Sequence, residues 1–165
     1  MIYEAIVQSH FNYCDGVLGQ AKKTQLDRLQ VAQNKAVRAL VGAKPRCKAP
    51  PILKKLGYLN LDGKRRVHMA TAVWKGLHAQ VPDALSTLFR PSSDVHFHRI
   101  RGAISIGVFI ASVSTEQARR SFSHQAAMLW NSLPVDIRTT NSATKCRNMV
   151  YHHLLTGDSA VPVAT

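Results

Sequence analysis

The apolar positions in the first half of the chain recur every three or four residues, which is the spacing of a helix with one buried face. One such face, interrupted only by Gln33, comprises Leu26, Leu29, Ala36, Val37 and Leu40. Thr24 stands three residues before Asp27, as in a capping box, and Gly42 can take the left-handed conformation that ends a helix. The pattern therefore predicts a helix over residues 25–41.

Further helices are predicted on both sides of this one. Residues 2–14 have a short amphipathic pattern that Asp15 and Gly16 should end. The prolines of AKPRCKAPP, residues 43–51, indicate a loop whose last residue, Pro51, suits the first position of a short helix. That helix should stop at Gly57. Asp62 is then placed to cap a helix with an apolar side formed by Val67, Ala70, Thr71, Trp74 and Leu77.

The second half of the chain has a different pattern. Residues 91–102 are polar and rich in turn formers, which indicates a hinge loop. Residues 103–114 are β-branched and partly alternating, which favours an extended pair or hairpin. Helices follow over residues 123–132 and 142–155, with Pro134 between them. The predicted fold is mainly α, with a bundle-like helical unit (1–90), the hinge, and a small α+β segment (103–165). Whether the two parts share one core stays open.

Charge narrows the choice of partners. The chain has 22 Lys and Arg against 9 Asp and Glu, a formal net charge of +13, which favours a polyanionic partner. No apolar run is long enough for a membrane span and no secretion leader is visible, so we expect an intracellular protein of the nucleus or cytoplasm. Three separated cysteines predict neither a disulfide framework nor a zinc pair. Oligomeric state is left open.

The basic residues are concentrated between residues 22 and 66, where thirteen Lys and Arg stand against two Asp. On the predicted 25–41 helix, three of them form one stripe away from the apolar face. Another three lie in the first turn of the next long helix, where the macrodipole disfavours cations and a bound phosphate would relieve the conflict. The candidate phosphate-binding residues are Arg28, Lys35, Arg38, Lys54, Lys55, Lys64, Arg65 and Arg66. The alternative is a set of solvated faces that only confer solubility.

Other chemistry is less well supported. His96, His98, His152 and His153 are not accompanied by paired cysteines, so no metal site is expected. Ser121, Ser123, His124 and Asp136 include the residue types of a catalytic triad, but no nucleophile elbow surrounds them, and capping or surface roles are expected. Trp74 and Trp130, with Leu133, are expected in the core, although the two tryptophans could instead stack on bases. We predict no catalytic residue and no cofactor.

Four segments in order carry a family resemblance: HFNYCDGVLG, LDRLQVAQNKAVRALVG, LKKLGYLNLDGKRRVHMATAVWKGL and RRSFSHQAAMLWNSLP. Together they resemble the region after the polymerase palm in reverse transcriptases of non-LTR retrotransposons of the jockey and CR1 type. The last segment resembles the family's C-terminal packing element. In that element Trp130 would anchor a small core, Asn131 and Ser132 would satisfy backbone groups at a helix end, and Pro134 would enforce the exit.

The resemblance implies a thumb-like C-terminal fragment of an RNA-directed DNA polymerase. The paired aspartates of a palm are absent from this sequence, so no polymerase activity is expected of the chain alone. It implies DNA, RNA or an RNA–DNA hybrid as the partner, held through phosphates. Two alternatives stay open: a non-functional relic of a decayed element, or a protein-interaction module in which residues 104–113 add a strand to a partner sheet.

Overall fold

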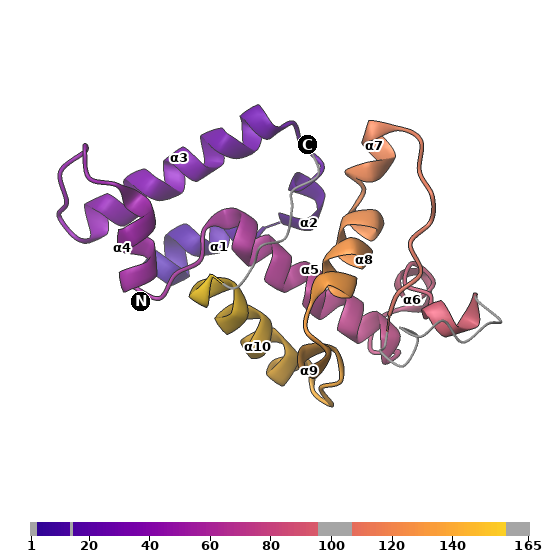
Figure 1. Cartoon of the computed structure of the whole chain (residues 1–165). Coiled ribbons are helices and arrows are strands. Elements are labelled where there is room, and N and C mark those ends of the chain that lie inside the picture. The colour runs from indigo at the N-terminus through magenta and orange to yellow at the C-terminus, as the bar shows by residue number, and fades with distance from the viewer. Residues whose placement is uncertain (1–2, 14, 96–106, 158–165) are drawn as a thin grey trace.

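The computed structural model describes residues 3–13, 15–95 and 107–157, and these residues are mainly helical, as predicted (Figure 1). The first half contains the π-helix η1 (Tyr3–Gln8), α1 (Ser9–Asn12), α2 (Asp15–Leu18), α3 (Lys23–Leu40), α4 (Ala49–Lys55), α5 (Leu61–Leu77) and α6 (Asp83–Ser86). The second half contains the 3-10 helix η2 (Ser92–Asp94), α7 (Glu116–Arg119), α8 (Phe122–Ser132), α9 (Val135–Arg138) and α10 (Ala143–Thr156).

Helix α5 is the centre of the main core, with α8 and α10 packed along it (Figure 1). Trp74 of α5 and Trp130 of α8 are 1% and 0% exposed, and Leu133, just after α8, is also buried. The indole Nε1 of Trp74 donates a hydrogen bond of 2.8 Å to the carbonyl oxygen of Thr140. Buried residues from both sides of the expected hinge therefore belong to one core, which answers the question that the sequence leaves open.

A second, smaller cluster lies where α3 and α4 meet η1. Its buried members are Tyr3, Val37 and Leu53. Gln33 interrupts the apolar face of α3 yet is fully buried, because its Nε2 donates to the carbonyl oxygen of Leu59 at 3.2 Å. The amide thus satisfies a main-chain acceptor of the segment that leads into α5, as buried polar groups require.

The ends of α3 differ in part from the expectation. The predicted helix over residues 25–41 is confirmed as Lys23–Leu40, and Gly42 has φ +63°, in the left-handed region. The capping box is wrong: Thr24 is already the second helical residue, and the N-cap Lys22 makes no side-chain capping bond. A residue whose own backbone is helical cannot act as N-cap, since the cap requires an extended backbone.

Three other boundaries are corrected. Asp15 does not end a helix but begins α2, and the expected helix over residues 2–14 appears as η1 and α1, with residues 1, 2 and 14 outside the described part. Pro51 is the third residue of α4. Asn60, not Asp62, caps α5, because its side chain accepts from the Gly63 amide at 2.7 Å. The apolar side predicted for this helix is confirmed, and Gly57 has φ +71° after α4.

The extended pair predicted in the second half is not confirmed. The described residues there contain one isolated antiparallel bridge, between Pro91 and Val108, and residues 96–106 of the predicted hinge and strand lie outside the described part. The two predicted helices over 123–132 and 142–155 are confirmed as α8 and α10. Pro134 stands between α8 and the short α9, as expected of a residue that cannot continue a helix.

Candidate nucleic-acid interface

The basic stripe predicted on α3 faces away from the core. Arg28 and Lys35 are exposed, seven residues apart, while the opposite side of the helix buries Gln33 and Val37. Seven residues correspond to about 10 Å along a helix, or about three base-pair steps of a duplex. Arg38 is half-buried because its Nη1 donates to the carbonyl oxygen of Cys47 at 3.3 Å. This bond ties the loop after α3 to the last turn of the helix.

The stripe continues into that loop and into α4. The loop presents Lys44, Arg46 and Lys48, all exposed, and α4 ends in the exposed Lys54 and Lys55. Cations in the last turn of a helix are favoured by its dipole. In Figure 1, α3, the loop and α4 form one lobe at the end of the molecule away from α6. The lobe therefore presents positive charge from three consecutive segments.

We call this set the α3–α4 cations: Lys22, Lys23, Arg28, Lys35, Arg38, Lys44, Arg46, Lys48, Lys54 and Lys55. Asp27 is the one acid among residues 22–55. Apart from Arg38, each of these cations is exposed. Throughout the described ranges, none of them forms an ion pair with a carboxylate. Their charge is therefore free to attract a polyanion, and it is uncompensated within the lobe itself.

The predicted cluster at the start of α5 is arranged differently. Arg65 Nη1 lies 3.4 Å from Asp62 Oδ1, and Arg66 Nε lies 2.8 Å from Asp62 Oδ2. The side chains of the two arginines are only 13% and 19% exposed. Asp62, in the first turn of the same helix, therefore relieves the conflict between these cations and the helix dipole, a role that the sequence analysis assigned to a phosphate.

Lys64 is half-buried beside the two arginines. Burial lowers the pKa of its ammonium group, an effect that Glu4 opposes and Arg147 reinforces. A desolvated ammonium group has lost part of its attraction for a mobile polyanion, because fewer of its donors face solvent. Of the eight predicted phosphate-binding residues, the structure thus brings Arg28, Lys35, Arg38, Lys54 and Lys55 to the lobe. At the start of α5, Arg65 and Arg66 are paired with Asp62, and Lys64 is half-buried.

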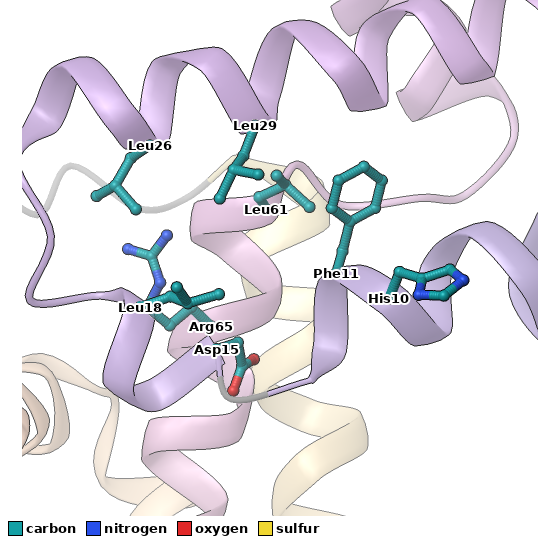
Figure 2. A pocket seen from close by; sticks show the side chains of 8 residues that line it. All are labelled: His10, Phe11, Asp15, Leu18, Leu26, Leu29, Leu61 and Arg65. Atoms are coloured by element: carbon teal, nitrogen blue, oxygen red, sulfur yellow. The ribbon is translucent and has the colours of Figure 1, made fainter.

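A small cavity lies beside the side chain of Arg65 (Figure 2). It measures about 40 Å³, and Arg65 lines it together with Asp15, Leu26 and Leu61. A Cβ on Gly19 would lie 2.7 Å from Arg65 Cδ, so the glycine leaves room for the arginine side chain next to the end of α2. Nearby, Asp15 Oδ2 pairs with Nδ1 of His68 and joins α2 to α5. The cavity has room for about one water molecule, not for a ligand.

The other chemically suggestive residues have structural positions. Ser121 is the N-cap of α8 and accepts from the His124 amide at 3.4 Å, a capping role that the sequence analysis expected. Asp136 is exposed on α9. His96 and His98 lie outside the described residues. Within the described ranges, no three His, Cys, Asp or Glu side chains are grouped as a metal site would require.

Sequence reasoning missed five members of the α3–α4 cations as individual candidates: Lys22, Lys23, Lys44, Arg46 and Lys48. Lys44, Arg46 and Lys48 contributed to the charge count, but the prolines around them gave no periodic face from which to choose them. Their spacing, with cations on alternate residues of a loop, was the available signal. The bond from Arg38 to Cys47, which holds that loop against α3, depends on folding and has no signature in the sequence.

No family model, no curated protein and no solved structure matches this chain. Among the described residues, no helix combines the length and the apolar character needed to cross a membrane.

Proposed function

We propose that this chain is a nucleic-acid-gripping accessory region, the C-terminal part of a non-LTR retrotransposon reverse transcriptase, without a catalytic site of its own. The α3–α4 cations would hold the phosphate backbone of DNA, RNA or a hybrid, independent of base sequence. The retroelement origin is supported by the four ordered segments that resemble the jockey-type family, and by no comparison beyond them.

One observation carries the gripping role. Within the described ranges none of the α3–α4 cations is paired with a carboxylate, all but Arg38 are exposed, and one acid lies among them. Basic residues that serve only solubility are commonly interspersed with acids, as in a mixed-charge surface. In residues 22–55 of this chain, basic residues occur almost without acidic ones. Arg65 and Arg66 at the start of α5 act as an internal comparison, because they do have an acidic partner, Asp62.

The test measures binding to a fluorescent 20-base-pair DNA duplex at several salt concentrations. An RNA–DNA hybrid and a single strand of the same length are titrated in parallel. Displacement of counterions predicts a linear fall of log K with log salt, with a slope of about −0.9 for each phosphate contact on B-DNA. Replacing both Arg28 and Lys35 with Gln should make the slope less steep by about two contacts, or about 1.8.

The matched control replaces Arg119 and Lys145 with Gln. Both are exposed, they lie on α7 and α10, and the double substitution removes the same charge from the chain. It should leave the slope nearly unchanged. Equal effects of the two double variants would mean that overall charge, not the lobe, attracts the polyanion, and binding that does not respond to salt would exclude a phosphate grip altogether.

A further inference from the structure

Residues 107–115 form a segment, here called the arm, that leads to α7 as a long stretch without helix (Figure 1). Its first residues are firmly held: Phe109 N donates to the Arg90 carbonyl oxygen at 2.8 Å, and Ser92 N donates to that of Gly107 at 2.9 Å. At its other end the Thr115 side chain accepts from the Ala118 amide at 3.2 Å and caps α7. The arm is thus anchored at both ends.

Between these anchors the main chain has open hydrogen-bonding groups. Over residues 110–114, no main-chain hydrogen bond to another described residue is formed. The segment also has no helix or turn. An added strand binds to main chain whose donors and acceptors are not already paired. Ala111 and Ser112 are exposed, whereas Phe109 and Ile110 are half-buried, so only part of the arm is turned outward.

A groove of about 390 Å³ follows the arm. It is walled by Leu88 and Arg90 on one side, by Ile110 and Val113 of the arm, and by His124 of α8 on the other. Leu88 is exposed, as is Arg90. Among the described residues, no carboxylate lines the groove. Apolar walls with a cationic edge suit a ligand that combines apolar side chains with acidic groups.

We propose that the arm and its groove bind an extended, acidic segment of a partner protein, which pairs with residues 110–114 as an added strand. Alternate apolar side chains of the partner would enter the groove, and the carboxylates between them would lie at its rim, within reach of the long side chain of Arg90. Charge argues against a second copy of this chain as the occupant, because two chains of +13 repel each other. The binding surface is separate from the α3–α4 cations and does not depend on the proposed nucleic-acid grip.

The probe is a fluorescein-labelled hexapeptide of alternating valine and glutamate, titrated into the full chain, with the valine–lysine peptide as its charge-reversed counterpart. The first peptide should bind and the second should not. Ser112→Pro removes one main-chain donor at an exposed position whose amide makes no main-chain bond, so folding should survive while peptide affinity falls about tenfold. Arg90→Gln should weaken binding of the glutamate peptide by a similar factor.

A second readout does not rely on variants. Amide hydrogen exchange at residues 110–114 should slow when the peptide is saturating, because the open amides become donors. The double variant with Arg28 and Lys35 replaced by Gln should bind the peptide as the native chain does. Loss of binding in that variant, with no effect of Ser112→Pro, would place the peptide on the α3–α4 cations and overturn the proposal. Concentration-dependent dimerisation that protects the same amides would assign the arm to a second copy, and would also overturn it.

Discussion

Asn131 holds both main-chain polar groups of Val108. Its Nδ2 donates to the Val108 carbonyl oxygen at 2.8 Å, and its Oδ1 accepts from the Val108 amide at 2.9 Å. The amide side chain thereby takes the place of a neighbouring strand, and it fastens the arm to α8. The family resemblance implied instead that Asn131 satisfies backbone groups at a helix end. Only Ser132 acts in that way, donating to the Leu129 carbonyl oxygen at 2.6 Å.

Replacing Asn131 with Ala should lower the free energy of unfolding by about 1–3 kcal/mol, because the amide and carbonyl of the buried Val108 would lose their partner. Urea denaturation followed by circular dichroism measures this directly. Asn141→Ala is the matched control, since Asn141 is exposed just after α9. Equal stability of the two variants would show that water replaces the Asn131 side chain at no cost.

Gly76 tests how closely α5 packs against the turn after α6. A Cβ at this position would lie 2.8 Å from Cδ2 of Phe89, a buried ring, so something must move. Alanine is the better helix former by about 1 kcal/mol, but overpacking a core costs about 1–3 kcal/mol. We therefore expect Gly76→Ala to destabilise the protein.

The combination with Phe89→Leu separates these two effects. Leucine at position 89 lacks the ring atom that the new methyl group at position 76 would meet. The double variant should therefore be more stable than the sum of the stability changes of Gly76→Ala and Phe89→Leu predicts. Strict additivity in the thermal midpoints would mean that Phe89 moves aside freely, and that Gly76 is not required for packing.

How far the fold follows from the sequence can be judged at particular residues. The apolar periodicity of α3, α5, α8 and α10 placed these helices within about two residues, because a repeated pattern over three or more turns averages out local errors. Their starts were less predictable. Thr24 and Asp62 have capping chemistry, yet Lys22 and Asn60 hold the extended cap positions, since the local backbone path decides which residue lies at the boundary.

The sequence predicted that the candidate site is basic, but not which basic side chains are exposed and which are paired. A count of basic residues treats Arg28 and Arg65 alike, although one is exposed and the other is folded onto Asp62 next to the end of α2. The difference arises because Gly19, 46 positions earlier in the chain, leaves space for the Arg65 side chain. In the same way, the contact of Asn131 with Val108 joins residues 23 positions apart and has no periodic signature.

Cys146 should make the protein less stable in alkaline solution. Burial raises the pKa of its thiol above the ordinary value of 9.0, an effect that a hydrogen bond with Thr140 partly offsets. Above pH 9.0 the thiol of the unfolded chain loses its proton while that of the folded chain keeps it. The folded state then binds more protons, so the free energy of unfolding falls as pH rises through this window and levels off above the pKa of the folded thiol.

The measurement is the urea midpoint of unfolding at several pH values between about 8 and 10. Above this range the raised pKa values of Tyr3 and Tyr151 would also lower the free energy of unfolding as pH rises. Cys146→Ala should flatten the decline, and Cys47→Ala, at an exposed thiol, should leave it unchanged. Lys64 acts in the opposite direction, because its lowered pKa makes stability rise as pH increases toward 10.5. The contribution of Lys64 is the same in the native chain and in both cysteine variants, so it cancels when they are compared. If stability falls equally steeply with pH in the two variants, the buried thiol ionises as freely as the exposed one.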